Sequence, residues 1–98
     1  MTDKQLLSSR ALALHRENRG KLGIVSKVPL ANRDDLSLAY TPGVAAVSEA
    51  LAADSALMYE LTPKGNMVAV ISDGSAVLGL GNIGPEGAYP VMEGKCLL

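Results

Sequence analysis

The sequence predicts an α/β fold in which a small sheet has flanking helices. Two apolar runs of strand length, Met67–Ile71 and Ala76–Leu80, are separated by the four-residue turn Ser72–Ser75. Short continuous runs rich in β-branched residues are typical of strands buried on both faces. Capping residues near the amino terminus and a proline ahead of an apolar stretch near the carboxyl terminus predict helices on either side. We therefore expect the two strands to form the core.

The first expected helix begins at Thr2, whose hydroxyl would form a capping box with Gln5. It should end near Asn18 and Gly20, where a helix stop signal follows. Its apolar face consists of Leu6, Leu7, Ala11 and Leu14. An amphipathic opening helix needs a partner surface to bury that face. His15 lies in this helix without a second metal ligand at helical spacing, so we expect a structural role for it.

The segment after this helix is expected to be extended and then polar. Lys21–Val28 is a short β-type stretch, and the adjacent carboxylates Asp34 and Asp35 follow it. Side chains one residue apart diverge in both helices and strands, so this pair alone cannot close a metal site. We expect the pair to lie in a solvated turn or to cap a helix.

A second helix start is expected after Tyr40, with Thr41 as N-cap and Pro42 at the first helical position. The free amides of Gly43 and Val44 could hold a carboxylate or phosphate, and the Tyr40 phenol beside them could donate a proton. Alternatively, the tyrosine packs against the core and fixes the start of the helix. The residues alone leave both roles open.

The turn Gly79–Gly84 has the glycine spacing of the dinucleotide fingerprint, in which Gly79, Gly81 and Gly84 would let the backbone approach a pyrophosphate. A true fingerprint requires a helix that begins inside the motif, and we expect Pro85 and Pro90 to break such a helix. A tight turn that lines some other cleft accounts for the same pattern. Nucleotide binding through this turn therefore remains an alternative.

The last expected helix begins at Pro90, which places Lys95 in its second turn among Met92, Cys96 and Leu98. A lysine with apolar neighbours is either a general base or, more simply, a solvated surface residue. Cys96 is the single cysteine, so it forms no internal disulfide. We expect it to fill the core.

A length of 98 residues, 48% hydrophobic content and a formal net charge of −1 describe one soluble globular unit without the basic surface that nucleic acid requires. No cationic leader precedes an apolar segment, and no apolar run approaches the roughly eighteen residues of a membrane span. We therefore expect a cytoplasmic protein with no membrane partner. Because the chain stops inside the last predicted helix, we also expect it to be truncated at its C-terminal end.

Four segments, taken in order, resemble the amino-terminal domain of the short bacterial-type malic enzymes: LSLAYTPGVAAVSEAL, PKGN, VAVISDGSAVLGLGNIG and PVMEGK. The resemblance covers nearly the whole chain. It implies oxidative decarboxylation of L-malate to pyruvate and CO2, with NAD or NADP and a divalent Mg or Mn ion. It further implies that residues 1–98 are the substrate-side domain of a two-domain dehydrogenase, with the cofactor domain absent from this chain and the metal ligands downstream of Leu98.

The resemblance also implies roles for single residues. Tyr40 in the YTPG motif and Lys95 in the MEGK motif correspond to the catalytic tyrosine and lysine of the family. Lys95 would take the proton of the malate C2 hydroxyl, the metal would stabilise the enolate, and Tyr40 would protonate enolpyruvate. Larger family members have a substrate-binding arginine where this chain has Ala76. The backbone sites proposed to replace it are Gly43, Val44, Gly81 and Asn82.

The sequence also predicts self-association, and it leaves two alternative functions open. The apolar first helix predicts a homodimer or a higher homo-oligomer. The first alternative function is a non-catalytic dimerisation or interaction fragment of the same domain. The second is a nucleotide-binding module that uses Gly79–Gly84. By itself this chain is expected to oxidise no malate and to bind NAD(P) weakly, because it lacks room for a separate dinucleotide-binding unit.

Overall fold

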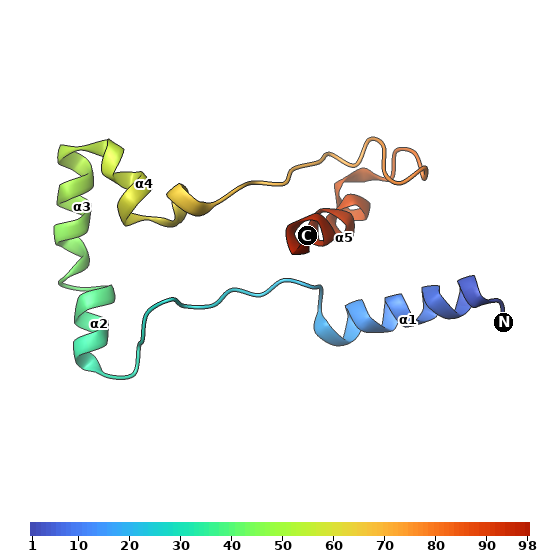
Figure 1. The fold of residues 1–98 in the computed structure, drawn as a ribbon, viewed down its shortest axis with the longest axis horizontal. Coiled ribbons are helices and arrows are strands. Elements are labelled where there is room, and N and C mark those ends of the chain that lie inside the picture. Colours follow the sequence, from blue (N-terminus) through green and yellow to red (C-terminus); the bar gives the residue numbers. More distant parts are fainter. The chain divides into compact units, whose positions relative to one another are not determined.

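The computed structural model describes residues 1–98 and contains helices and loops without strands (Figure 1). The chain divides into two units, one made of Met1–Ile24 and Ala69–Leu98, the other of Val25–Val68. The helical elements, in order, are α1 (Asp3–Asn18), α2 (Arg33–Ala39), α3 (Val44–Ala53), η1 (Ser55–Leu57), α4 (Met58–Leu61), η2 (Pro63–Asn66) and α5 (Gly84–Leu97). None of these helices is both long enough and apolar enough to cross a bilayer.

Helix α1 begins as the sequence predicts. The Gln5 amide donates to the Thr2 hydroxyl at 3.1 Å, and the Thr2 amide donates to the Gln5 side chain at 2.8 Å, which completes the capping box. The helix ends where Arg19 and Gly20 adopt positive φ angles of 55° and 98°. No residue of α1 is buried, so the partner surface expected for its apolar face is not supplied by this chain.

The predicted sheet is not confirmed. Met67–Ile71 is extended, but no other segment pairs with it, and Val68 is 90% exposed. Ala76–Leu80 is not a strand but a tight loop in which the Leu80 amide donates to the Val77 carbonyl at 2.7 Å. A strand requires a neighbour for its backbone groups, and a run of apolar residues does not provide one by itself. Lys21–Val28 also lacks a pairing partner and is not a strand.

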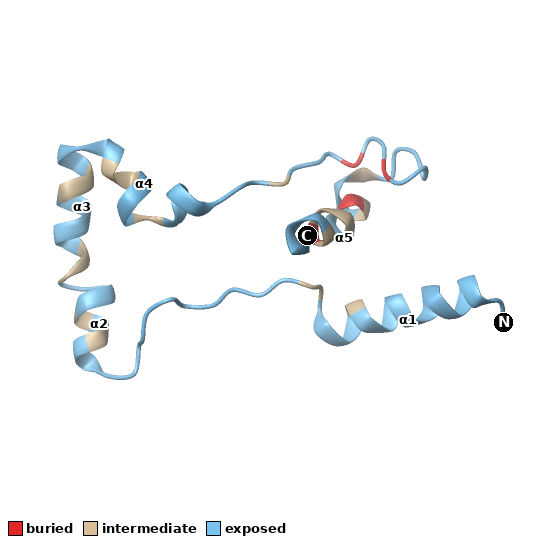
Figure 2. Cartoon of the chain, in the orientation of Figure 1, coloured by how far each residue is buried: buried red, intermediate tan, exposed pale blue.

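The best packed part of the first unit joins this loop to the start of α5. The amides of Ile83 and Gly84 both donate to the Gly74 carbonyl at 3.1 Å, and a Cβ at Gly74 would collide with the Gly84 carbonyl. In this part of the chain Val77 is 6% exposed and Ala88 is 1% exposed, and Figure 2 colours buried residues red. The glycine at position 74 is therefore required by close backbone approach.

This contact explains why α5 begins at Gly84, whereas the sequence predicted a start at Pro90. With the Gly84 amide already bound to the Gly74 loop, Pro85 occupies the start of the helix, where its missing N–H costs nothing. Pro90 lies inside α5 and removes the hydrogen bond that its position would donate to Glu86. The helix therefore continues past a position at which one backbone hydrogen bond is missing.

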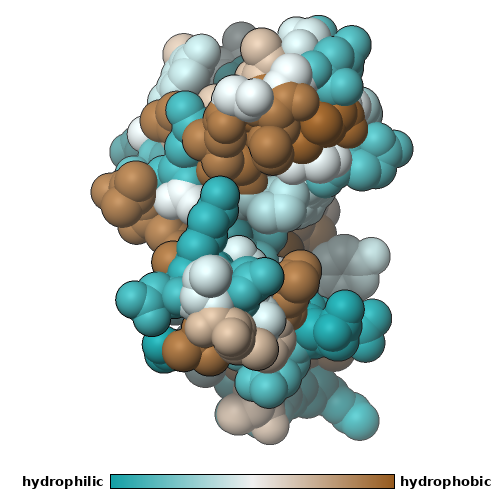
Figure 3. Space-filling view, turned by 90° about the vertical axis from the view of Figure 1, so that its right-hand side faces the viewer, coloured by the Kyte–Doolittle hydropathy of each residue, from teal (hydrophilic) through white to brown (hydrophobic).

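The second unit is a series of short capped helices. Asn32 caps α2 by accepting from the Asp35 amide at 2.9 Å, and the Asp35 carboxylate accepts from the Ala31 amide at 2.9 Å. The prediction that the Asp34–Asp35 pair serves a helix cap is thus confirmed for Asp35. No residue in the helices of this unit is buried. Apolar side chains of this unit consequently remain exposed. Brown apolar areas are also exposed on the face that Figure 3 shows, which is the right-hand side of Figure 1.

Candidate active site

Lys95 lies in the last turn of α5, not in the second turn as predicted, because the helix begins at Gly84. Its side chain is exposed and makes no hydrogen bond within the chain. The second turn would lie near the positive amino-terminal end of a helix, whereas the last turn lies at the carboxyl-terminal end, which carries the partial negative charge. A mobile amine at the end of a helix is open to a ligand from solvent.

Tyr40 lies between α2 and α3, in the second unit. Its amide donates to the Leu36 carbonyl at 2.8 Å, and its carbonyl accepts from the Val44 amide at 2.6 Å. The phenol is 64% exposed, which does not match the alternative role of packing against a core. The backbone around Tyr40 is therefore fixed by both neighbouring helices, while its hydroxyl is accessible.

The predicted helix start after Tyr40 differs in detail. Thr41 is not the N-cap: α3 begins at Val44, its N-cap is Gly43, and no side chain caps it. The Gly43 amide donates to the Ser37 carbonyl at 2.8 Å, and the Val44 amide is bound to Tyr40. Because both amides already have partners, they do not form the free anion site that the sequence suggested.

The turn at Gly81 and Asn82 differs from that helix start. Both residues are exposed, and their amides make no hydrogen bond within the chain. Gly79 and Gly81 have φ angles of 75°, and a Cβ at either position would meet no atom within 4 Å. Of the four backbone positions proposed as anion sites, Gly81 and Asn82 therefore keep free amide donors.

The glycine turn meets only part of the dinucleotide fingerprint. A helix does begin inside it, at Gly84, so the expectation that Pro85 and Pro90 prevent this is wrong. However, no strand precedes the turn, and the carboxylate of Glu86 lies in the first turn of α5, where it disfavours a pyrophosphate. The residues of this chain do not form a complete dinucleotide site.

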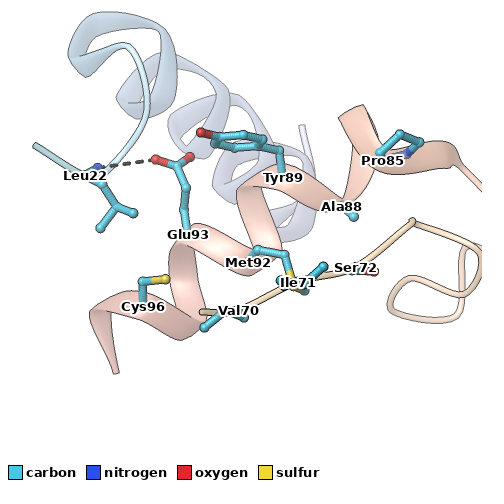
Figure 4. A pocket seen from close by; sticks show the side chains of 10 residues that line it. All are labelled: Leu22, Val70, Ile71, Ser72, Pro85, Ala88, Tyr89, Met92, Glu93 and Cys96. Carbon is cyan, nitrogen blue, oxygen red and sulfur yellow. Dashed lines mark hydrogen bonds between the residues drawn. The ribbon is translucent and has the colours of Figure 1, made fainter. Parts of the chain in front are cut away.

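A cavity of about 320 Å³ lies between α5 and the extended segment that precedes the glycine loop (Figure 4). Its walls are mainly apolar, formed by Leu22, Val70, Ile71, Ser72, Pro85, Ala88, Tyr89, Met92, Glu93 and Cys96. Cys96 is exposed at this cavity and does not fill a core, which corrects the sequence prediction. The reason is that the segment opposite Cys96 covers only part of the helix face.

Glu93, whose carboxylate joins α5 to the residues that follow α1, was not identified from the sequence. It is 8% exposed, and its carboxylate accepts hydrogen bonds from the amides of Lys21 at 2.8 Å and Leu22 at 3.3 Å. The second of these bonds is drawn in Figure 4. The hydrogen bond from the Lys21 amide, assisted by the one from Leu22, lowers the pKa of Glu93 below its usual value. Its burial opposes this shift.

The Lys21 side chain completes this connection. Its ammonium donates to the Pro90 carbonyl at 2.9 Å and to His15 Nε2 at 2.6 Å. His15 Nδ1 lies 2.7 Å from the Ala11 carbonyl, so Nδ1 carries the proton and Nε2 accepts. The structural role predicted for His15 is confirmed. A signal for Glu93 was visible in the sequence, because it is an acidic residue in the otherwise apolar stretch around the MEGK motif.

Acidification is expected to release Lys21 and Leu22 from α5. The folded-state pKa of Glu93 is lowered, so its stabilisation is fully present above the unfolded glutamate pKa of about 4.3 and is lost as pH falls through the folded value. In the isolated chain, NMR titration should show both amide resonances moving with a midpoint below about pH 4.3. Glu93→Gln should remove this titration. A midpoint above the ordinary glutamate range would contradict the prediction.

No group of three or more His, Cys, Asp or Glu side chains in the structure is arranged to hold a metal ion. The carboxylates nearest the loops, Asp73 and Asp35, are each engaged with backbone amides, and Asp73 accepts from Ser75 at 3.0 Å. This hydrogen bond lowers the pKa of Asp73. The carboxylates of Asp73 and Asp35 are thus already used by the backbone of this chain.

Comparison with known proteins identifies the family. The family model for the malic enzyme N-terminal domain matches residues 19–98, which include both Tyr40 and Lys95. The chain therefore belongs to the malic enzyme family, in its N-terminal domain. The resemblance noted in the sequence is confirmed.

Individual relatives agree with this assignment. The chain is 59% identical over 92 residues to the bifunctional malic/malolactic enzyme of Bacillus subtilis, covering 94% of this chain and 22% of that protein. It is 52% identical over 101 residues to an NADP-dependent malic enzyme of Rhizobium meliloti, covering 99% of this chain and 13% of that protein. The crystal structure of an NAD-dependent malic enzyme from Thermotoga maritima matches with a TM-score of 0.81 and 58% identity, over 87% of this chain and 24% of that one. The chain thus spans between 13% and 24% of the length of these relatives.

Proposed function

We propose that this chain supplies the two proton-transfer residues, Lys95 and Tyr40, for the oxidative decarboxylation of L-malate to pyruvate and CO2. The observation that carries the proposal is that both side chains are exposed and lie in motifs within the segment matched by the malic enzyme family. Relatives named as NAD- and NADP-dependent malic enzymes support a nicotinamide cofactor. Because most of their length lies outside the matched segment, we propose that the cofactor and a divalent metal are held there.

The proposed proton transfers balance over one turnover. As the C2 hydrogen of malate leaves as hydride to the nicotinamide, the Lys95 amine takes the C2 hydroxyl proton and oxaloacetate forms. The bond from C3 to the C4 carboxylate then breaks, CO2 leaves, and its electron pair remains as the enolate of pyruvate. The Tyr40 hydroxyl donates a proton to C3. Exchange with solvent removes the proton from Lys95 and returns one to Tyr40, which restores both residues.

Substrate binding is the less defined part of the proposal. The free backbone amides of Gly81 and Asn82 can donate hydrogen bonds to a carboxylate, whereas Gly43 and Val44 have no free amide to offer. We propose the former pair as the substrate-carboxylate contact. Its glycine spacing would also let a ligand approach the backbone closely at Gly81.

A chimera tests the function directly. The matched segment of this chain is joined to the remainder of the Bacillus subtilis relative in place of its own matched segment, so that the residues under test are those of this sequence. The chimera should reduce NAD or NADP when malate and Mn²⁺ are supplied. Failure of a folded chimera to oxidise malate, while the unaltered relative does so, would refute the proposal.

The isolated chain is expected to show no malate oxidation and no tight binding of NAD or NADP. No group of three or more His, Cys, Asp or Glu side chains is arranged to hold a metal ion, and no strand precedes the glycine turn, as a dinucleotide site requires. Calorimetric titration with NAD, NADP and Mn²⁺ plus malate checks this, and inorganic phosphate serves as a control anion. Micromolar dinucleotide binding would favour the nucleotide-binding alternative through Gly79–Gly84.

Self-association is expected through α1. Leu6, Leu7 and Leu14 are exposed on a helix that buries no residue within the chain. We propose that a second copy covers this face and forms a homodimer or higher homo-oligomer. Analytical ultracentrifugation at tens of micromolar should show a species heavier than the monomer, and Leu7→Glu should shift it to monomer. Monomeric behaviour of the unaltered chain would contradict this, and Leu12→Glu, on another side of α1, is the matched control.

A further inference from the structure

Helix α5 has a weak point just before its functional end. Pro90 lies in the helix interior and cannot donate to the Glu86 carbonyl, so the hydrogen-bond ladder is interrupted there. The turn that carries Lys95 follows this interruption. An interior proline destabilises a helix and tends to kink it. The direction of the last turn therefore depends on contacts from outside the helix.

Those contacts come from the residues that follow α1. The Lys21 ammonium binds the Pro90 carbonyl, the Glu93 carboxylate accepts from the Lys21 and Leu22 amides, and the Lys21 Cε lies 4.0 Å from the position of a Cβ on Gly94. Positions 90, 93 and 94 are spaced i, i+3 and i+4, so they share one face of α5. The contact thus bridges the proline from one side of the helix.

We propose that Glu93 is a positioning residue, which fixes the last turn of α5 and thereby aims Lys95 at the substrate. This inference rests on the proposed function of Lys95. A carboxylate that binds two consecutive backbone amides restrains rotation of the helix, whereas a single apolar contact would not.

The contact leaves Lys95 free to react. At about 100° per residue, Lys95 lies about 160° around the helix from Glu93 and about 140° from Pro90. The face of α5 that contacts Lys21 and Leu22 and the face that carries the Lys95 amine are therefore nearly opposite. Glu93 acts on the lysine through the helix backbone and not by touching it, which separates its role from that of a catalytic residue.

The loop is shaped to receive this carboxylate. Gly20 has a φ of 98°, so the backbone calls for glycine there, and a Cβ at this position would lie 2.8 Å from Glu93 Oε2. His15 accepts from the Lys21 ammonium and holds it over Pro90. The titratable groups that act on Glu93 are thus Lys21 and His15.

Two substitutions in the chimera test the proposal. Glu93→Ala removes the acceptor and should lower kcat for malate by about 10- to 100-fold, with a much smaller change in KM, because a small misplacement of a reacting group has effects of this size. Glu93→Gln keeps an oxygen that can accept from both amides and should retain most of kcat. Glu86→Ala removes an exposed glutamate of the same helix, which makes no side-chain hydrogen bond, and should be neutral.

The outcomes separate this proposal from the function on which it rests. If Lys95→Ala is inactive but Glu93→Ala is fully active, the positioning role alone is overturned. If Lys95→Ala keeps its activity, the proposed function is overturned. Circular dichroism melting of each variant shows whether it folds. In the chimera, amide hydrogen exchange in the last turn of α5 should accelerate in Glu93→Ala and not in Glu93→Gln. Equal exchange in both variants would also overturn the proposal.

Discussion

Lys95→Ala is expected to abolish malate oxidation by the chimera, with kcat falling by about 10³-fold or more and with folding retained. General base catalysis contributes about 10²- to 10⁴-fold in enzymes, and the C2 hydroxyl proton has no other acceptor proposed in this chain. The side chain is exposed and makes no hydrogen bond, so its loss should not destabilise α5. Lys4→Ala, which removes an exposed lysine of α1, is the matched control. Dinucleotide reduction under saturating malate gives kcat.

The partial reactions locate the defect. Because Lys95 acts in the hydride-transfer step, oxaloacetate supplied directly should still lose CO2 in the Lys95→Ala chimera at a rate much closer to the parent. Methylamine in the assay should restore part of the malate activity if the lost group is an amine base. Equal loss of both reactions would instead indicate a damaged site, and a kcat near that of the parent would remove Lys95 from the mechanism.

Local signals in the sequence were reliable where a few neighbouring residues determine the structure. The capping box of Thr2 and Gln5 and the use of Asp35 in a helix cap both depend on hydrogen bonds within four residues, and both are present. The family resemblance singled out Tyr40 and Lys95 because it covers their surroundings, and their catalytic roles stay predictions. These features require no knowledge of distant packing.

Features that depend on distant contacts were not predictable in the same way. The apolar run Met67–Ile71 has the composition of a strand, but strand pairing needs a partner segment that composition does not specify. The start of α5 is fixed by the contact between Gly74 and Gly84, so the proline rule alone placed it too late. Glu93 meets its partner Lys21 across 72 positions of sequence, a pairing that periodicity cannot reveal.

The same reasoning explains the error at the proposed anion sites. A proline after a threonine is a good signal for the start of a helix, yet the first turn there is closed by backbone carbonyls, since Ser37 accepts from Gly43 and Tyr40 accepts from Val44. Free amides at a helix start depend on how the preceding chain folds back. At Gly81 and Asn82 the positive φ angle of the glycine turns the backbone outward and leaves the donors free.

Tyr40→Phe should slow complete turnover of malate by about 10²-fold or more, because the substitution removes only the hydroxyl that is proposed to donate a proton to C3 of enolpyruvate. The ring remains, and the backbone hydrogen bonds of Tyr40 with Leu36 and Val44 do not involve the hydroxyl. The expected signature is a split between two partial reactions. Release of CO2 from oxaloacetate should be largely retained, whereas exchange of the pyruvate methyl protons with D2O should be lost.

Proton NMR of pyruvate in D2O measures the exchange, and Tyr59→Phe provides the matched control. Tyr59 lies in the same unit as Tyr40 and is 62% exposed, and the centroid of its ring is 6.0 Å from the Lys64 ammonium. It belongs to neither motif. Its variant should exchange and decarboxylate like the parent. If Tyr40→Phe instead lost both partial reactions equally, the hydroxyl would be serving substrate binding. If it lost neither, the C3 proton would come from another donor, because a phenylalanine ring has no proton to give at that position.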